Sequence, residues 1–311
     1  MADALTDVGG ALAARLPGAV TFDVALSGLT TYRLGGPVSV LVRARTLADL
    51  VELAAVVVEH RPPVLVVGRG SNLLVADQGF AGVAVVLTGD FEQLDLTVSP
   101  GSTVRAGAAV ALPVLARRAA AAGLRGLEFF VGIPGSVGGA VRMNAGGHGR
   151  DTATVLGSAL VVDLGAGGTA RALGPAELAF GYRTSSLGPL DVVTGAELAV
   201  DAASPEECEE TIAEVVRWRR EHQPGGSNAG SVFANPPGDS AGRLIDSLGL
   251  KGLRVGGAVV SEKHANFFQA EAGATADDVA RLVEEVRRRV ADATGVVLVP
   301  ELRLVGFEAL E

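Results

Sequence analysis

Two glycine-rich stretches of this 311-residue chain hold the residue types and spacings best suited to binding an anion. The longer stretch spans residues 126–149, and eight of its 24 residues are glycine. Because glycine weakens regular structure, such a density is typical of backbone that turns sharply or approaches another group closely. Pro134, Gly135 and Ser136 predict a turn that opens a short helix, whose bare N–H groups could bind an anion. From this stretch alone, a buried loop at a tight crossing is an equal alternative.

The second stretch, residues 68–72, follows an apolar run at 64–67 that predicts a short buried strand. A strand that leads into Gly-x-Gly is typical of a dinucleotide-binding fold, but Leu73 stands where the third glycine of that fingerprint should be. Residues 74–82 also contain glycines where the helix of that fold would have to run. What remains is a tight turn with free amides, which suits a pyrophosphate held by loop backbone.

Composition limits the class of protein, its partners and its location. The length and a hydrophobic fraction of 48% predict roughly two globular domains. A formal net charge of −9 argues against nucleic acid or an anionic membrane as partner. No apolar run approaches the ~18 residues of a membrane span, and the N-terminus is acidic where a signal peptide would be basic, so we expect a cytoplasmic protein. The single Cys208 excludes an intrachain disulfide, and the four histidines lack metal-ligand spacing.

Periodicity predicts the elements that position these stretches. Apolar spacing and capping residues predict helices over 46–59, 111–122, 204–221, 241–248 and 275–293. Apolar runs predict strands over 38–42, 64–67, 83–87, 94–98, 103–106, 155–162, 170–173, 192–200, 259–269 and 296–305. The composition changes at Ser204, where a charged helix begins, and we place a domain boundary there. Residues 1–25 are weakly patterned, with one or two helical turns at 11–16, and are predicted to be an N-terminal extension.

Seven short motifs, in a fixed order, make the chain resemble one family. It is similar to the UDP-N-acetylenolpyruvoylglucosamine reductases, flavoenzymes of peptidoglycan precursor synthesis, over nearly all residues from Thr30 to Gly306. The motifs are Thr-Tyr-Arg-Leu-Gly-Gly (31–36), Val-Gly-Arg-Gly-Ser-Asn-Leu (67–73), the glycine-rich residues 132–149, Phe-Gly-Tyr-Arg (180–183), Ala-Gly-Ser-Val-Phe (229–233), Ser-Glu-Lys-His-Ala-Asn-Phe (261–267) and Pro-Glu-Leu-Arg-Leu-Val-Gly (300–306).

The resemblance implies an α+β fold with a two-lobed FAD domain of the PCMH/vanillyl-alcohol-oxidase type at 26–203 and a smaller C-terminal α/β substrate domain at 204–311. The lobes would span about 26–88 and 89–203. It also implies non-covalent FAD, with its pyrophosphate on the two glycine-rich stretches, and NADPH as reductant. The cofactor-binding residues that it implies are Gly68, Gly70, Ser71, Asn72, Gly132, Pro134, Gly135, Ser136, Gly138, Gly139, Asn144, Gly146 and Arg303. The substrate-binding residues that it implies are Tyr182 and Asn235, and it implies no metal.

The implied reaction is reduction of the enolpyruvyl ether of UDP-N-acetylglucosamine to UDP-N-acetylmuramate. This chemistry needs a hydride source, a cation for the carboxylate and an acid for the adjacent carbon, and a cofactor is required because no side chain donates hydride. By resemblance, Arg183 polarises the carboxylate, Ser231 donates the proton and Glu301 is the acidic partner. Without the motifs, Arg183 would be interpreted as a surface residue and Ser231 as a turn residue. Glu301 would be interpreted as the partner of Arg303 in an exposed ion pair on one face of an edge strand.

Two details place the chain within the family. Only residues 237–240 separate the Asn-Pro of the serine motif from the next predicted helix, so the chain resembles the short-loop subgroup. Ala234 stands where members often carry a basic residue, which leaves a cationic substrate contact at this position in doubt.

Two alternative functions differ from the implied one. The first is an oxygen-using sugar or lactone oxidase on the same fold, but residues 68–72 contain no histidine that could tether flavin covalently. The second is a sugar-nucleotide-binding protein without redox activity, which the presence of Arg183, Ser231 and Glu301 disfavours. We expect a UDP-sugar as the small-molecule partner, and no nucleic acid, membrane or obligate protein partner.

Overall fold

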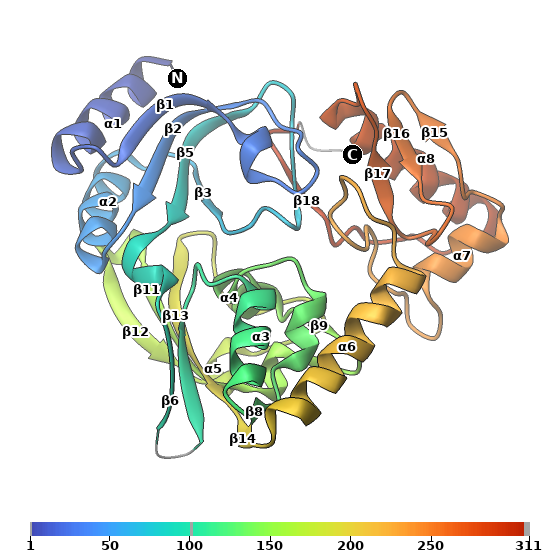
Figure 1. Cartoon of the computed structure of the whole chain (residues 1–311). Coiled ribbons are helices and arrows are strands. Elements are labelled where there is room, and N and C mark those ends of the chain that lie inside the picture. Colours follow the sequence, from blue (N-terminus) through green and yellow to red (C-terminus); the bar gives the residue numbers. More distant parts are fainter. Residues whose placement is uncertain (1, 100–101, 308–311) are drawn as a thin grey trace. The chain divides into compact units, whose positions relative to one another are not determined.

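The computed structural model describes residues 2–99 and 102–307 (Figure 1). The described chain divides into two units. Unit 1 contains the described residues of Met1–Asp23, Ser39–Arg69 and Gly82–Trp218, and unit 2 contains those of Val24–Val38, Gly70–Ala81 and Arg219–Glu311. Both units contain helices and strands, which confirms the predicted α+β class. No helix among the described residues is long and apolar enough to cross a membrane.

The regular elements follow the predicted order. The helices are α1 (Ala2–Arg15), α2 (Leu47–His60), α3 (Leu112–Ala121), α4 (Val137–Met143), α5 (Pro175–Leu178), α6 (Pro205–His222), α7 (Ala241–Ser247) and α8 (Ala276–Thr294). The strands are β1 (Val20–Ala25), β2 (Pro37–Ala44), β3 (Val64–Val67), β4 (Leu73–Val75), β5 (Phe80–Leu87), β6 (Leu94–Ser99), β7 (Thr103–Gly107), β8 (Leu124–Arg125), β9 (Gly146–Gly147), β10 (Arg150–Asp151), β11 (Leu156–Asp163), β12 (Thr169–Leu173), β13 (Asp191–Ala199), β14 (Asp201–Ala202), β15 (Arg254–Val255), β16 (Ala258–Val260), β17 (Phe268–Ala270) and β18 (Arg303–Val305).

A five-stranded sheet of unit 1 has the order β12-β11-β13-β7-β6, and each neighbouring pair is antiparallel. Successive side chains of a strand point to opposite faces, and both faces of β13 are covered near its start. Val192 belongs to the apolar cluster that contains α2, whereas Val193 belongs to the cluster that contains α3. The sheet therefore has two apolar faces at this point, and a charged side chain is excluded from both.

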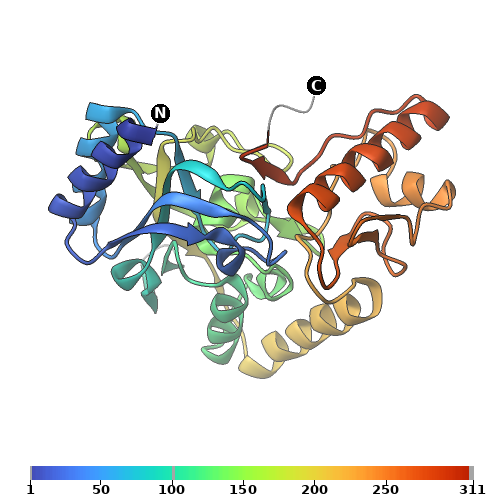
Figure 2. The ribbon, with the colours of Figure 1, turned by 90° about the horizontal axis from the view of Figure 1, so that it is seen from above.

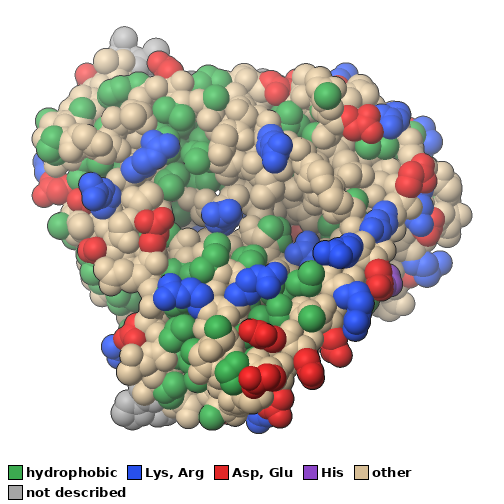
Figure 3. Space-filling view, in the orientation of Figure 1, with side chains coloured by type: hydrophobic (Ala, Val, Ile, Leu, Met, Phe, Trp, Pro, Cys, Tyr) green, Lys and Arg blue, Asp and Glu red, His purple; other side chains and the backbone are tan. Residues whose placement is uncertain are grey.

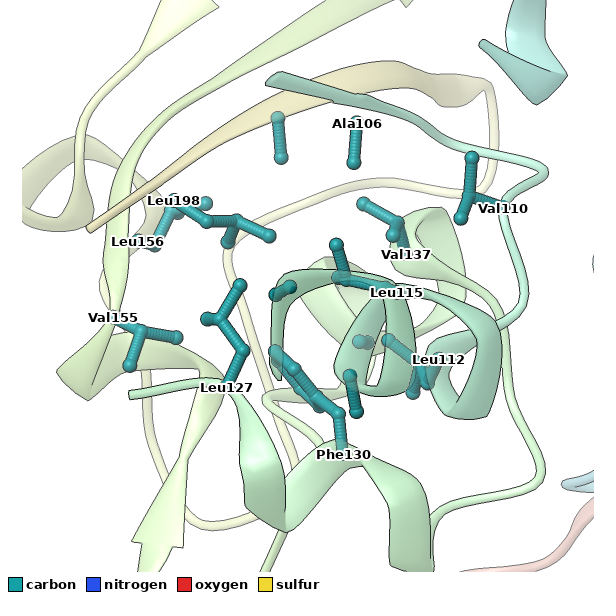
Figure 4. Close-up of a cluster of buried hydrophobic side chains, with 14 of the residues drawn as sticks. Ala106, Val110, Leu112, Leu115, Leu127, Phe130, Val137, Val155, Leu156 and Leu198 are labelled. Carbon is teal, nitrogen blue, oxygen red and sulfur yellow. The ribbon is translucent and has the colours of Figure 1, made fainter. Parts of the chain in front are cut away.

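Helix α3 packs one apolar face against this sheet. Leu112 and Leu115 lie three residues apart on α3, so they share the face that Figure 4 shows within the cluster. Phe130 and Leu127, from the 3₁₀ turn before α4, fill the space beside them. Removing a leucine side chain from such a cluster costs about 2–5 kcal/mol. This packing holds the chain that leads into α4.

A second sheet has the order β1-β2-β5-β3, and most of its residues belong to unit 1, where they share an apolar cluster with α1 and α2. Thr46 and Asp49 form a capping box at the start of α2, and Figures 1 and 2 show α1 beside α2. Val8 and Leu12 of α1 are buried in the same cluster as the inner face of α2. The weakly patterned N-terminal residues thus contain a full helix that contributes to the core.

Unit 2 is built from three separate segments of the chain. Its main helix, α8, packs on the antiparallel sheet β15-β16-β17, and β18 pairs in parallel with β4. Tyr32, 1% exposed, donates a hydrogen bond from its hydroxyl to Phe268 O at 3.1 Å. Asp77 accepts hydrogen bonds from the first two amides of α8, at 3.1 Å each. The early segments therefore complete the core and cap the main helix of this unit.

Two predicted strands are wrong in extent. Residues 259–269 form two short strands, β16 and β17, with a turn at 261–267 between them. Of residues 296–305, only β18 is a strand, because residues 299–302 bond to the serine loop through isolated pairs and not through a ladder. The alternation that was expected to put Glu301 and Arg303 on one face therefore does not apply.

Helix α6 runs from residue 205 to residue 222, so it crosses from the segment of unit 1 into that of unit 2. Acidic residues occupy its first turn and basic residues its last turn, an arrangement that favours the helix dipole. Figure 3 shows acidic side chains near the start of α6 and basic ones toward its end. The sequence-based domain boundary near residue 203 stays a prediction.

Tyr32→Phe should lower the free energy of unfolding by about 1–3 kcal/mol, because Phe268 O then lies buried without its donor. Urea denaturation of the parent and the variant measures this difference. An unchanged midpoint would mean that water replaces the hydroxyl and that the segment around Tyr32 is held by apolar contacts alone.

Candidate functional site

Helix α4 begins at the Pro-Gly-Ser turn of the longer glycine-rich stretch. Ser136 has an extended backbone, is 3% exposed, and accepts a hydrogen bond at Oγ from Gly139 N at 3.4 Å, which makes it the N-cap. The N–H groups of Val137 and Gly138 donate to carbonyls of residues 108–110, at 3.0 and 2.9 Å. The predicted helix is therefore confirmed, but its own first amides are not bare, because α4 starts against the segment that leads into α3.

Free amides lie directly before the helix instead. Within the described chain, the N–H groups of Gly135 and Ser136 donate no hydrogen bond. A Cβ built on Gly139 would meet only Ser136 Oγ, at 3.6 Å, so this side of the turn is open. Two unpaired donors beside open backbone are suited to a phosphate oxygen.

Three other predicted glycines are needed by the chain itself. A Cβ on Gly138 would come within 3.0 Å of Ala108 Cβ, and one on Gly146 within 2.6 Å of Arg150 O. Gly70 has φ +60°, and its Cβ would collide with Leu29 O. At these positions a tight crossing of chain segments is sufficient to require glycine. The cofactor role of Gly70, Gly138 and Gly146 stays a prediction. Gly139 differs, because the protein itself leaves room for a Cβ there and only a bound group would exclude a side chain.

The shorter glycine-rich stretch presents free amides as well. In unit 2, the N–H groups of Gly70, Ser71 and Asn72 donate no hydrogen bond within the described residues. Gly70 O accepts one from Thr31 N at 3.3 Å, and the Thr31 Oγ1 atom beside this loop is buried without a partner. Because most buried polar atoms are hydrogen-bonded, an orphaned hydroxyl next to free amides indicates a missing group. Thr31 was not predicted as a site residue, although it lies in the 31–36 motif.

Gly68, the predicted cofactor residue at the other end of this turn, belongs to unit 1. A Cβ on Gly68 would lie 2.7 Å from Ser136 Oγ. Within unit 1, the first glycine of the short stretch therefore lies against the serine that caps α4.

Arg183 lies in a turn that is fixed to the other end of α4. Its Nη1 donates to Asn144 O at 3.3 Å and its Nη2 to Gly146 O at 2.8 Å. Its backbone has φ +54°, a conformation that costs a non-glycine residue about 1–3 kcal/mol and is found mainly where surrounding structure imposes it. The neighbouring Tyr182 is 59% exposed, and its ring lies 5.3 Å from Arg183 Cζ. The guanidinium is thus held in place by backbone carbonyls.

Asn144, predicted to bind the cofactor, organises this region. Its Nδ2 donates to Asp151 Oδ2 and to Gly181 O, both at 3.0 Å, and its Oδ1 accepts from Ala153 N at 2.9 Å. The left-handed backbone of Asn144, with φ 41°, ends α4 and turns the chain toward β9. These contacts join the end of the helix to the turn that carries Arg183. Direct cofactor binding by Asn144 stays a prediction.

Unit 2 brings Ser231 and Glu301 together. Ser231 pairs with Phe267 in an isolated antiparallel bridge, and the adjacent Val232 O accepts a hydrogen bond from Glu301 N at 2.8 Å. Asn72 Nδ2 donates to Glu301 O at 2.9 Å, so the shorter glycine-rich stretch reaches the same segment. Glu301 Oε1 is buried.

Two further predicted residues of unit 2 have contacts of their own. Arg303 N donates to Asn72 O at 3.0 Å at the start of β18, and the Arg303 side chain is exposed. Asn235 Oδ1 accepts a hydrogen bond from Ala241 N at 3.1 Å, which fixes the loop before α7. The cofactor role of Arg303 and the substrate role of Asn235 stay predictions.

The sequence matches known proteins along both units. Residues 38–173 match an FAD-binding domain, and residues 222–305 match the C-terminal domain of UDP-N-acetylenolpyruvoylglucosamine reductase. The reductase of that name from Paramagnetospirillum magneticum is 43% identical over 294 residues, which are 94% of each chain, and the one from Methylorubrum extorquens is 44% identical over 311 residues, 99% of this chain and 98% of its own. The chain belongs to the UDP-N-acetylenolpyruvoylglucosamine reductase family.

A solved reductase of this family has the same fold. The crystal structure of UDP-N-acetylenolpyruvylglucosamine reductase from Thermus caldophilus aligns with a TM-score of 0.80 at 40% identity, covering 92% of this chain and 98% of that chain. The predicted family is confirmed, and so is its α+β fold, with an FAD-binding domain and a C-terminal domain characteristic of these reductases.

The residues of this chain fit the FAD of the family. In unit 1, Gly135 and Ser136 offer free amides beside the open side of Gly139, and in unit 2 the amides of residues 70–72 lie beside the orphaned Thr31 hydroxyl. Backbone donors of this kind bind phosphate without a net positive charge, which suits a chain of charge −9.

Gly139→Ala should weaken FAD binding by tenfold or more and leave the apo-protein as stable as the parent or up to about 1 kcal/mol more stable, since alanine favours a helix interior over glycine. Fluorescence titration of apo-protein with FAD and urea unfolding measure the two quantities. Gly10→Ala, in α1 with nothing within 4 Å of its Cβ, is the matched control and should change only stability. Unchanged FAD affinity in Gly139→Ala would remove the α4 turn from the cofactor site.

Proposed function

We propose that this chain reduces the enolpyruvyl ether of UDP-N-acetylglucosamine to UDP-N-acetylmuramate, with NADPH as reductant and non-covalent FAD, in peptidoglycan precursor synthesis. Its support is the similarity to reductases of this name over at least 94% of the chain in the two relatives above. The observation that supports it best is the hydrogen bond between Glu301 N and Val232 O, because it joins the backbone of the proposed acidic partner to the loop of Ser231. A cytoplasmic location is part of the proposal, supported by the unpaired Cys208 and the need for NADPH.

The reaction adds one hydride and one proton across a carbon–carbon double bond. NADPH becomes NADP⁺, the hydride ends on the carbon distal to the carboxylate, and the proton ends on the carbon that bears it. Bound FAD supplies the transfer of hydride from NADPH to the substrate. The side chains of this protein have the remaining tasks, which are to stabilise the charge that develops on the carboxylate and to deliver the proton.

Arg183 is proposed to stabilise that charge. An arginine has five N–H donors, and two nitrogens of Arg183 are held by Asn144 O and Gly146 O. A cation fixed by backbone carbonyls does not have to reorganise when charge appears, and such preorganised groups supply several kcal/mol. Tyr182 and Asn235 are proposed to contact the substrate. The residues proposed to contact the cofactor are Gly68, Gly70, Ser71, Asn72, Gly132, Pro134, Gly135, Ser136, Gly138, Gly139, Asn144, Gly146 and Arg303.

Ser231 is proposed to deliver the proton, with Glu301 as its partner. A serine hydroxyl is a weak acid, so it protonates only a strongly basic carbon and needs neighbours that stabilise the alkoxide or replace the lost proton. A carboxyl group at Glu301, with its buried Oε1, is suited to replace that proton. The loop before Ser231 is fixed as well, since Gly230 N donates to Asn228 Oδ1 at 3.0 Å.

Ser231→Ala should leave reduction by NADPH within about twofold of the parent and slow reoxidation by the enolpyruvyl substrate about 10²–10⁴-fold, the loss typical of a positioned acid. Anaerobic rapid mixing, which follows the flavin absorbance in each half-reaction, measures both rates. Ser231→Cys keeps a dissociable proton and should retain more activity than Ser231→Ala.

Ser227→Ala is the matched control, because Ser227 lies in the same loop and its described contact is made by its backbone carbonyl to Ala270 N. It should change neither half-reaction. Equal loss of both half-reactions in Ser231→Ala, or reoxidation at nearly the parental rate, would reduce Ser231 to a loop residue.

Arg183→Met should lower kcat about 10²–10³-fold, as loss of a preorganised charge does, and leave the unfolding midpoint nearly unchanged. Arg183→Lys should fall between the two, since it keeps the charge and loses the planar fork. Arg61→Met is the control, because Arg61 also has a left-handed backbone, with φ 49°, and is exposed in unit 1. Parental turnover in Arg183→Met would make Arg183 an ordinary surface residue.

A further inference from the structure

The 261–267 motif between β16 and β17 has no role in the chemistry described so far. It contains two buried polar residues, Ser261 and Asn266, of which Asn266 is 3% exposed. Burying a carboxamide is unfavourable unless its donors and acceptor are paired. The partners of Asn266 therefore indicate what the motif does.

Both ends of the Asn266 carboxamide bond to the backbone of one residue. Oδ1 accepts a hydrogen bond from Phe233 N at 3.0 Å, and Nδ2 donates to Phe233 O at 2.8 Å. The Asn266 backbone adds a third bond, because its carbonyl accepts from Val232 N at 2.9 Å. Asn266 thus acts on residues 232–233 as a neighbouring strand would, although neither segment is part of a continuous ladder.

The other edge of the same segment is held from residues 299–301. Val232 O accepts from Glu301 N at 2.8 Å, and Ala234 N donates to Val299 O at 2.9 Å. Ser231 directly precedes this doubly held segment, and its own bridge to Phe267 adjoins Asn266. The direction in which Ser231 leaves the segment is therefore set on one side by residues 299–301 and on the other by Asn266.

Asn266 is itself fixed by its own loop. Its N–H donates to His264 Nδ1 at 3.2 Å, and Phe267 N donates to His264 O at 3.0 Å. Burial lowers the pKa of the His264 imidazole, which agrees with an unprotonated Nδ1 that accepts this bond. Phe233 and Phe268 pack edge to face, with centroids 5.9 Å apart, and are 1% and 0% exposed. This apolar packing limits the access of water to the pair.

We propose that Asn266 is a positioning residue for proton delivery: its carboxamide holds the backbone of residues 232–233 so that Ser231 faces the substrate carbon. The inference rests on the proposed role of Ser231 as proton donor. A misplacement of about 1 Å in a reacting group can cost 10²-fold in rate, so loss of a pair that fixes this backbone is sufficient to slow the step. Hydride transfer from NADPH does not involve Ser231 and is unaffected by this pair.

The test measures the two half-reactions of the FAD-loaded protein by anaerobic rapid mixing. Asn266→Ala should slow reoxidation by the enolpyruvyl substrate tenfold or more and leave reduction by NADPH within about twofold of the parent. Thr275→Ala, which removes the N-cap of α8 in the same unit, is the control for lost stability and should leave the ratio of the two rates unchanged. A loss of equal size in both half-reactions would overturn the proposal, since a merely structural role predicts that result.

A double-mutant cycle separates this inference from the function on which it rests. If Asn266 acts through Ser231, Asn266→Ala should have no further effect on reoxidation in a Ser231→Ala background. If Asn266→Ala slows reoxidation in the Ser231→Ala background as much as it does in the parent, the positioning role is overturned and Ser231 remains the donor. If Ser231→Ala alone reoxidises at the parental rate, the proposed donor is wrong and the positioning role is wrong with it.

Asn266→Asp covers the case in which Asn266→Ala does not fold. The carboxyl group of the variant can still accept a hydrogen bond from Phe233 N, but it can donate one to Phe233 O only when it is protonated. Burial raises the pKa of a carboxyl group, which brings this protonation into a measurable pH range. Reoxidation relative to the parent at the same pH should therefore recover as pH falls from 8 to about 5.5. Among its described contacts, Asn266 bonds one ionisable side chain, that of His264, while residues 231–234 and Gly242 of α7 carry no charge. Because His264 is present in both proteins, dividing the rate of the variant by that of the parent at each pH removes its contribution. A flat relative rate would overturn the proposal.

Discussion

Nearly all buried N–H and C=O groups outside helices and sheets need a hydrogen-bond partner, and this requirement governs the parts of the protein that carry chemistry. Side-chain carboxamides often meet it, and three of them show how. Asn144 joins the end of α4 to the turn of Arg183, Asn72 bonds the 68–72 turn to Glu301 O, and Asn266 pairs with Phe233. A carboxamide presents a donor and an acceptor side by side, so it replaces a strand neighbour without needing a second strand. Reactive groups can then lie on irregular backbone and still have fixed positions.

The glycines of the two motifs have different physical origins. Gly70, Gly138 and Gly146 are glycine because a Cβ would strike the protein's own atoms, whereas the Cβ of Gly139 would meet only Ser136 Oγ at 3.6 Å. Density of glycine in a sequence cannot separate these cases, because both forbid a side chain. The free amides of residues 135–136 and 70–72 are the feature that does point to an anion, and they become visible only when the hydrogen bonds of the surrounding chain are assigned.

Periodic segments were predictable from the sequence, and irregular ones were not. The stripe of α8, the Thr46 cap of α2 and the strands of the five-stranded sheet follow from local patterns that the structure reproduces. The strand predicted at 296–305 is present only as β18, because residues 299–302 pair with the serine loop through isolated bonds and not through a ladder. Helix α1 was underestimated because alanine and glycine dilute its apolar face. Family motifs found Ser231 and Glu301, which the structure places together, but missed Thr31 and Asn266, whose importance lies in what they contact far along the chain.

The construction of unit 2 from three distant segments has a consequence for how the protein is made. Tyr32 and Phe268, which share a buried hydrogen bond, are separated by 236 residues. At roughly 5–20 residues per second, the ribosome completes the partner of Tyr32 on the order of 10–50 s after Tyr32 itself is made. Residues 24–38 and 70–81 therefore leave the ribosome long before the core that they complete exists. During synthesis their apolar side chains must be shielded by other means, and an expressed fragment that begins at residue 219 would lack both the Tyr32 contact and the Asp77 cap of α8.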